Sequence, residues 1–327
     1  MMDTCSNIDK PFTVIICTYN GALRLYDVVS RITGQASYDK LIESVLIVDN
    51  NSSDNTREVA FKLVELKPNI RYLYEPAQGL SAARANGVRQ TLTEWIIFLD
   101  DDNYIQPDWI EKCYNYIQDH AEVGAFNGCI VPSFSFQPTP TQEALMKIIY
   151  KGLACTTHSE SAGSCADCEQ WMPVGAGLVI RAQPLREYVA SGWTVSTGRV
   201  GSNTASGEDT DMVKYVMRSG YKPGFCDRMM MYHRIDSKRL EEGYVLRLFG
   251  SFADYKYVCD SNSRHYISIR AAQFLISLAK LSAWNILPLI RPNNIHIQLK
   301  SKISIAWHAR YINRCLGDKL ILRNHAV

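Results

Sequence analysis

The stretch WIIFLDDD, residues 95–102, decides how the rest of this 327-residue sequence is interpreted. Five apolar or aromatic residues, 95–99, lead directly into three aspartates. A short, continuous apolar run is typical of a strand buried on both faces, as in a parallel sheet. We therefore expect a buried strand whose carboxyl end presents Asp100, Asp101 and Asp102.

Three similar apolar runs precede this stretch, and helical patterns lie between them. The expected strands are 13–17, 45–48 and 70–74, and the expected helices are 22–32, 54–66 and 81–92. Asp54 and Ser81 are the expected N-caps of the last two helices. This alternation predicts right-handed βαβ units in an α/β, Rossmann-like fold, with a mostly parallel central sheet flanked by helices. Ligands of such sheets bind beyond the carboxyl ends of the strands.

The remaining sequence divides at about residue 235. Further elements are expected as a helix ending near 119, a helix at 142–150 in an irregular stretch, a glycine-rich strand within 171–181 and a helix at 209–219. From about residue 240 the pattern is mainly helical. We predict one domain at 1–235 and a helical, basic C-terminal extension at 236–327.

Charge is distributed unevenly along the chain. The whole sequence has 35 basic and 33 acidic residues, a net charge of +2 that does not indicate a nucleic-acid partner. Residues 261–327 contain ten Lys or Arg and one acid, so the C-terminal region carries +9 and the remainder −7. With 10 cysteines and no recognisable secretory segment, we expect a cytoplasmic protein with reduced thiols.

Residues 271–290 contain one charged residue, Lys280. Four residues near helical spacing form a polar stripe: Gln273, Ser277, Lys280 and Pro288. We predict an amphipathic helix that lies on a membrane surface, with Arg270 and Arg291 near the headgroups. A helix packed on the rest of the protein or on a second subunit, and a true membrane span, are the alternatives.

Two acidic clusters are candidates for chemistry. Three adjacent carboxylates repel one another, and a divalent cation with nucleotide phosphates would offset the repulsion at residues 100–102. The alternative is a solvated acidic turn. The second cluster begins at Glu208, where Glu208 or Asp209 is placed to act as a general base on a hydroxyl, while Asp211 is assigned to helix capping.

Four motifs in this order resemble those of family 2 glycosyltransferases with the GT-A fold. They are DNNSSDNT at 49–56, QGLSAARANG at 78–87, LDDD at 99–102 and GED at 207–209. The resemblance covers about residues 11–235. It implies a GT-A fold, a sugar donor that is a nucleotide diphosphate sugar, inversion at the anomeric carbon, and Mn²⁺ or Mg²⁺ as cofactor.

The resemblance also implies roles for individual residues. The implied nucleotide-sugar-binding residues are Thr18, Tyr19, Asn20, Asp49, Gln78, Gly79, Arg84, Asp100 and Asp101. Among them Tyr19 stacks on the base, Asp49 accepts a hydrogen bond from it, and Arg84 approaches a phosphate. Asp102 and His233 are the implied metal ligands, although a lone histidine is also compatible with a structural role. Asp209 is the implied catalytic base, and Glu208 holds the acceptor.

The segment around residue 175 is the implied acceptor and sugar contact. Its members are Trp171, Gly175 and Gly177, where glycine permits close backbone approach to a ligand. A tryptophan stacks on sugar faces, but Trp171 is equally compatible with a core position.

The expected activity is metal-dependent, inverting sugar transfer, with a UDP-sugar as donor and a lipid-linked glycan of cell-surface polysaccharide assembly as acceptor. The protein is then peripheral on the inner face of the cell membrane, and a homodimer is left open. A non-catalytic nucleotide-sugar-binding protein is the main alternative. A nucleotidyltransferase is disfavoured because residues 17–22 lack lysine and contain a single glycine, and a dehydrogenase because G-x-G-x-x-G is missing after the first strand.

Four residues show a spacing that suits zinc: Cys155, His158, Cys165 and Cys168. The intervening six residues are short for such a site. A cysteine-containing loop without metal is the alternative.

Overall fold

The computed structural model describes residues 10–157, 172–192, 207–261 and 266–324. These residues form two compact units. The first unit runs to Ser133, resumes at Ala154 and again at Glu208, and ends at Ile235. The second unit contains Phe134–Leu153, Gly207 and the chain from Asp236 onward. The segment Phe134–Leu153 thus groups with the C-terminal helices, although the sequence placed it within the first domain.

The first unit is built on an eight-stranded mixed sheet with the order β3-β2-β1-β4-β7-β6-β8-β5. Its strands are β1 (Phe12–Thr18), β2 (Ile42–Asp49), β3 (Ile70–Tyr74), β4 (Trp95–Asp100), β5 (Asn103–Ile105), β6 (Val123–Ser133), β7 (Leu178–Arg181) and β8 (Lys222–Arg234). The four strands expected from the sequence, β1 to β4, pair in parallel as predicted. Beyond β4 the sheet becomes mixed: β7 is antiparallel to β4 and β6, β8 is parallel to β6, and β5 is antiparallel to β8.

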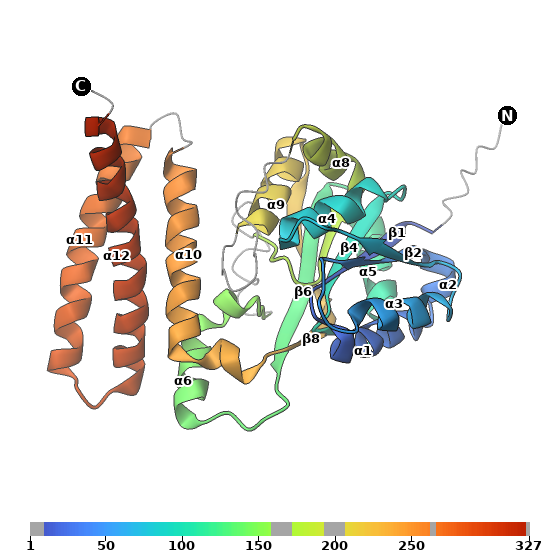
Figure 1. The fold of residues 1–327 in the computed structure, drawn as a ribbon, viewed down its shortest axis with the longest axis horizontal. Coiled ribbons are helices and arrows are strands. Elements are labelled where there is room, and N and C mark those ends of the chain that lie inside the picture. The colour runs from blue at the N-terminus through green and yellow to red at the C-terminus, as the bar shows by residue number, and fades with distance from the viewer. Residues whose placement is uncertain (1–9, 158–171, 193–206, 262–265, 325–327) are drawn as a thin grey trace. The chain divides into compact units, whose positions relative to one another are not determined.

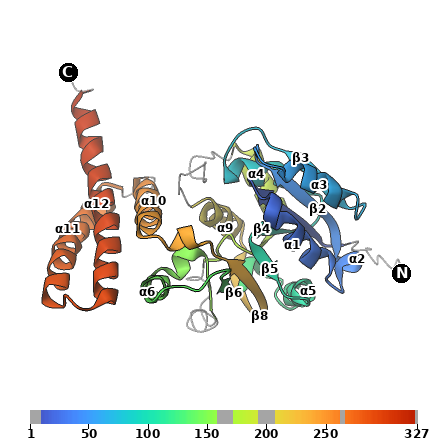
Figure 2. The ribbon, with the colours of Figure 1, turned by 60° about the horizontal axis from the view of Figure 1, so that its bottom comes forward.

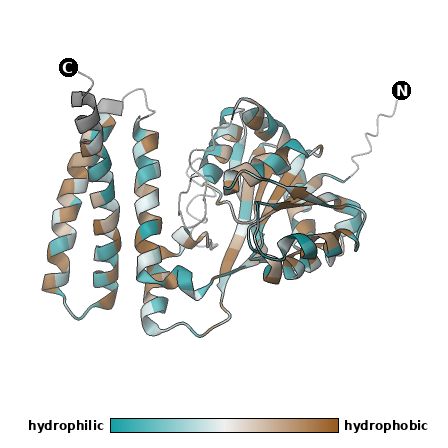
Figure 3. Cartoon of the chain, viewed as in Figure 1, coloured by the Kyte–Doolittle hydropathy of each residue, from teal (hydrophilic) through white to brown (hydrophobic). Residues whose placement is uncertain are grey.

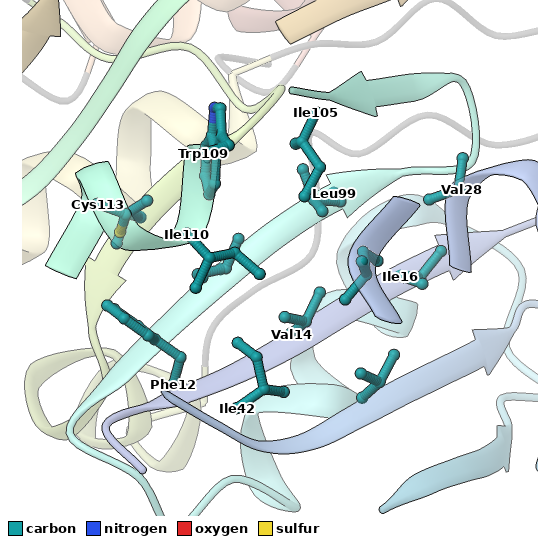
Figure 4. Packing of buried hydrophobic residues seen from close by; sticks show 14 of the residues in the cluster. Phe12, Val14, Ile16, Val28, Ile42, Leu99, Ile105, Trp109, Ile110 and Cys113 are labelled. Carbon is teal, nitrogen blue, oxygen red and sulfur yellow. The ribbon is translucent and has the colours of Figure 1, made fainter. Parts of the chain in front are cut away.

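Helices cover both faces of this sheet, which gives a three-layer α/β/α unit (Figures 1 and 2). The helices are α1 (Ala22–Thr33), α2 (Tyr38–Leu41), α3 (Thr56–Val64), α4 (Leu80–Arg89), α5 (Trp109–Asp119), α8 (Ala182–Ala190) and α9 (Glu208–Arg218). All residues of β1 are buried, so its side chains alternate between two cores. Val14 and Ile16 pack with α1 and α5 (Figure 4), whereas Ile15 and Cys17 pack with α4, α8 and α9.

The start of α4 differs from the expectation. Ser81 is not the N-cap; it lies inside the first turn and is buried, and Gly79 occupies the cap position with φ +136°. Glycine is required there because other residues rarely adopt that conformation. At α3 the N-cap residue is Asn55, while the Asp54 carboxylate accepts the Thr56 backbone N–H at 3.0 Å.

The second unit is helical. It contains α6 (Pro140–Ile149), two 3₁₀ turns (Lys151–Leu153 and Ser237–Leu240), α10 (Glu242–Ser261), α11 (Tyr266–Ile290) and α12 (Ile295–Asn324). A capping box between Thr139 and Gln142 begins α6. α12 contacts both α10 and α11, and Tyr257 and Tyr311 are buried in their small core. Among the described residues one helical segment, Ser268–Ile290, is long and apolar enough to cross a membrane.

Candidate active site

The predicted site lies where β1, β2 and β4 end. In the sheet register Thr18 stands beside Asp49, and Cys17 stands beside Asp100. Parallel strands present their carboxyl ends at one edge, so these polar residues gather there. Burial raises the pKa of the Cys17 thiol to about 12, because the thiolate would be poorly solvated inside the sheet.

The three adjacent aspartates turn to different partners, and this separates their charges. Asp101 is buried, and the Arg24 guanidinium donates to both of its oxygens at 3.0 Å. Thr18 Oγ1 donates to the same carboxylate at 2.6 Å. Burial nevertheless leaves the pKa of Asp101 above its ordinary value. The Asp101 carboxylate therefore serves as an internal anchor between β1, α1 and the end of β4.

Gly21 makes this anchor possible. A Cβ atom at residue 21 would lie 2.1 Å from Thr18 Oγ1 and 2.2 Å from Asp101 Oδ2. Both distances are shorter than any real contact, so only glycine fits between these side chains. The single glycine after β1 is thus a packing requirement.

The loop after β2 is tied by hydrogen bonds to β3 and to the loop after β1. Asp49 accepts from the Ser52 backbone N–H and from the Tyr72 hydroxyl, both at 2.9 Å. The pKa of Tyr72 is raised to about 12, mainly by burial and secondly by the hydrogen bond to Asp49. Asn20 has φ +51° and accepts from the Ser53 backbone N–H at 2.8 Å, which ties the β1 loop to the β2 loop.

The β3–α4 loop is fixed by a residue that the sequence analysis did not single out. Asn50 donates to the Ala77 carbonyl and accepts from the Gly79 backbone N–H, both at 2.7 Å. Next to Gly79, Gln78 is exposed, as is Tyr19 on the β1 loop. Tyr19 is therefore accessible for the predicted stacking on a base. No local pattern marks Asn50 as more than a strand-end polar residue, because its partners lie more than 20 residues away.

Arg84 joins the two acidic clusters. Its guanidinium lies 3.2 Å from Glu208 Oε1 and 3.7 Å from Asp100 Oδ1. Arg84 is 2% exposed and Glu208 is 5% exposed, so this is a buried ion pair. Burial alone would lower the pKa of Arg84, but the two carboxylates outweigh burial and raise it. The sequence predicted a phosphate contact for Arg84; in the structure its guanidinium faces these carboxylates.

Asp209 is oriented by two backbone donors. The Thr210 N–H donates to its Oδ1 and the Gly175 N–H to its Oδ2, both at 2.8 Å. A Cβ atom at residue 175 would lie 2.9 Å from Arg84 Nη2 and 3.1 Å from Asp209 Oδ2. Gly175 therefore allows the backbone to approach both side chains. Gly177 has φ +62°, and a Cβ atom there would meet Met231 Sδ at 2.7 Å, which indicates a packing role.

Asp102 and His233 face each other. Arg234 N–H donates to the Asp102 carbonyl at 2.9 Å, and Asn103 pairs with His233 in the β5–β8 register. This brings His233 Nε2 to 3.4 Å from Asp102 Oδ2. The other Asp102 oxygen accepts from Asn103 Nδ2 at 3.0 Å. The arrangement depends on β5 and β8, two strands that the sequence analysis did not predict.

This pair fits a divalent cation that shares its coordination with substrate. Carboxylate and imidazole suit Mn²⁺, and a carboxylate suits Mg²⁺. Within the described part of the chain, no group of three or more His, Cys, Asp or Glu side chains is placed to hold a metal. The remaining ligands would therefore have to come from phosphate oxygens and water.

Some predicted residues lie outside the described residues. These are Trp171 and three of the four zinc candidates: His158, Cys165 and Cys168. Cys155 is described and buried. The structure therefore leaves both predictions as they stood.

Comparison with known proteins agrees with this geometry. The family model for glycosyl transferase family 2 matches residues 13–167. Residues 13–167 belong to glycosyltransferase family 2. The matched segment includes β1 to β6 and the three aspartates at the end of β4.

Relatives of this family 2 segment include the glycosyltransferase AglE of Haloferax volcanii. The two are 36% identical over 104 residues, which cover 31% of this chain and 34% of AglE. The match thus spans about a third of that curated relative's length (34%).

Two solved structures show that the fold is of the GT-A type. The mannosyltransferase PcManGT of Pyrobaculum calidifontis, solved with GDP-Man and Mn²⁺, superposes with a TM-score of 0.60 at 18% identity, covering 92% of this chain and 87% of PcManGT. TarS 1–349 of S. aureus, solved with UDP-GlcNAc, gives a TM-score of 0.50 at 15% identity, covering 94% of this chain and 92% of TarS 1–349. These likenesses confirm the predicted fold class.

Proposed function

We propose that this chain is a metal-dependent, inverting glycosyltransferase that uses a nucleotide diphosphate sugar. The observation that carries the proposal is the contact of Arg84 with both Asp100 and Glu208. Asp100 and Glu208 are 108 positions apart in the sequence, yet one guanidinium contacts both. This contact supports a single site in which the acidic strand end is the donor side and the start of α9 the acceptor side.

On the acceptor side, Asp209 takes the proton of the attacking hydroxyl. Its two backbone donors fix the carboxylate, and each oxygen retains a lone pair that can accept the proton. The hydroxyl oxygen forms a bond to the anomeric carbon while the bond from that carbon to the diphosphate oxygen breaks. The electron pair leaves with the diphosphate. One carboxylate opposite the leaving group is sufficient for such a displacement with inversion.

On the donor side, Asp102 and His233 would hold the cation, Mn²⁺ or Mg²⁺. When bound, the cation neutralises charge that develops on the leaving diphosphate. The predicted nucleotide-sugar site lies at the same sheet edge. The residues proposed to line or support it are Thr18, Tyr19, Asn20, Asp49, Gln78, Gly79, Asp100 and Asp101. We propose a UDP-sugar as donor, because Asp49 and the exposed Tyr19 suit a uracil base. The structures with UDP-GlcNAc and with GDP-Man make UDP and GDP the two donors to compare first.

We further propose that the acceptor is a lipid-linked glycan of cell-surface polysaccharide assembly, reached from the cytoplasmic face of the membrane. The basic composition of residues 261–327 and the apolar length of α11 support this location. Glu208, with Gly175 and Trp171, is assigned to the acceptor and transferred sugar.

A thermal-shift panel tests the donor side. UDP, GDP, TDP and CMP are each added with Mn²⁺, Mg²⁺ or EDTA. A ligand at 100 times its Kd stabilises the folded state by about 2.7 kcal/mol. We expect UDP to stabilise the chain with metal and not with EDTA. A chain that responds to no nucleotide under any condition would contradict the proposal.

Substitutions separate an enzyme from a binding protein. We expect Asp209→Asn to retain the nucleotide shift and to lose sugar transfer, and Asp102→Asn to lose both the metal-dependent shift and transfer. Asp211→Asn is the matched control, since this acid lies in the same first turn of α9 and is assigned to capping. A protein that only binds nucleotide sugars would show the shift without any turnover.

A further inference from the structure

Along its length α11 exposes a stripe of uncharged, mostly apolar residues. Six exposed residues recur at spacings of three or four: Ala271, Leu275, Leu278, Ser282, Ile286 and Leu289. We call them the outer stripe. Leu275 is 65% exposed, Ile286 54% and Leu289 78%. Hydrophobic segments recur along α11 in Figure 3. An exposed apolar stripe of this length indicates a surface that a partner covers.

Two polar groups of α11 are held by neighbouring helices of the second unit. Ser277 is fully buried, and its hydroxyl lies 3.1 Å from His308 Nδ1 on α12. Arg270 hydrogen-bonds the Tyr257 hydroxyl of α10. Of the polar stripe predicted from the sequence, Ser277 thus lies on the packed side of the helix, whereas Lys280 is exposed.

The basic charge of the C-terminal region is partly neutralised within the helical unit. Lys302 pairs with Glu242 at 2.9 Å. Arg310 and Arg314 pair with Asp254 at 3.0 and 3.2 Å. These three cations of α12 are therefore matched by acids of α10. The +9 composition overstates the charge that is available to attract an anionic surface.

We propose that the outer stripe lies among the acyl chains at the surface of a lipid bilayer, and that this apolar contact, not basic charge, holds the protein there. The inference rests on the membrane location in the proposed function and names its chemistry. The segment Ser268–Ile290 has 23 residues, and at about 1.5 Å per residue it gives a continuous apolar edge.

Charge complementarity favours a bilayer over a second copy of the chain. Residues 261–317 contain no acid, whereas three cations are exposed: Lys280 on α11, Arg291 just after it and Lys300 on α12. A second copy of α11 would offer these cations no acid to pair with. Phosphate headgroups at a bilayer surface would instead complement them.

The charges also argue for lying on the bilayer and against crossing it. Lys280 is in the middle of α11, and α12, which packs along α11, carries the exposed Lys300 and Lys302. Charged side chains at the centre of a bilayer are costly and rare. Insertion of one face of α11 keeps these groups in water.

Vesicle flotation of the full chain tests the proposal. The probes are vesicles of phosphatidylcholine alone and of phosphatidylcholine with phosphatidylglycerol, at low and high salt. We expect binding to both, and binding to the neutral vesicles that persists at high salt. Replacing Leu275, Ile286 and Leu289 together by Gln should lower partitioning at least about 100-fold. Leu289→Gln alone should lower partitioning several-fold, and it should scarcely affect stability because Leu289 is 78% exposed.

The matched control replaces Leu23 and Leu92, each 93% exposed in the first unit, by Gln. It should leave partitioning unchanged. Binding only to anionic vesicles at low salt would overturn the proposal in favour of charge. Binding to no vesicles would overturn the proposal. A dimer that the triple variant disperses in light scattering would overturn it in favour of a second copy. The UDP thermal shift reports the donor site separately, so failure of either proposal is recognised on its own.

Discussion

Removal of the Arg84 guanidinium tests the link between the two acidic clusters. Arg84→Met keeps most of the side-chain volume and deletes the charge beside Glu208 and Asp100. Breaking a buried ion pair by removing one partner costs about 3–5 kcal/mol, because the other charge stays buried. We expect the free energy of unfolding to fall by about that amount, in urea titrations with an unchanged m-value.

The double variant makes the reasoning refutable. In Arg84→Met/Glu208→Gln the buried carboxylate is also neutral, so most of the loss should be recovered. Lys112→Met is the matched control: Lys112 pairs with Asp108 at 2.7 Å, closer than Arg84 to Glu208, but at the surface. We expect it to cost at most about 1 kcal/mol. If Arg84→Met costs as little as this control, or if Glu208→Gln brings no recovery, the buried pair is not what joins the clusters.

Three further outcomes follow from the structure. Gly21→Ala should lower the free energy of unfolding by about 1–3 kcal/mol because its Cβ overlaps buried polar atoms. Gly317→Ala, with open space around residue 317, should not destabilise the protein. Chemical denaturation compares the two variants, and equal effects would contradict the packing argument. Cys17, with a pKa raised to about 12, should resist alkylation at pH 9 in the folded protein while Cys259 reacts faster, as measured by mass spectrometry. The pKa of Cys17 is higher in the folded than in the unfolded state. The stabilisation from the neutral thiol is therefore present below about pH 9 and is lost as the pH rises towards 12. His233→Gln should raise the Mn²⁺ concentration needed for UDP stabilisation at least about tenfold. An unchanged Mn²⁺ titration would remove this histidine from the proposed metal site.

Much of the fold could be predicted because the signals are local. The continuous apolar runs of β1 to β4, and the helical patterns between them, are each recognised within a short window, from four residues at 45–48 to thirteen at 54–66. The strands β5, β6 and β8 were missed for a physical reason. β8 contains charged and polar residues such as Asp227 and Arg228, and its pairing with β6 joins segments about 100 residues apart. A pairing of that kind leaves no periodicity for a local pattern to detect.

The sequence by itself determined the parallel half of the sheet, the edge at which polar residues gather, and which acidic side chains are candidates for chemistry. Local hydrophobic period and strand-end position are enough for that. Only the tertiary structure decided which side chain each carboxylate contacts. It assigned Asp101 to Arg24, Asp102 to the neighbourhood of His233 and Glu208 to Arg84, because each assignment requires two distant segments to meet in a buried place. There an unpaired charge is costly, so each buried carboxylate needs a partner that the local sequence does not reveal.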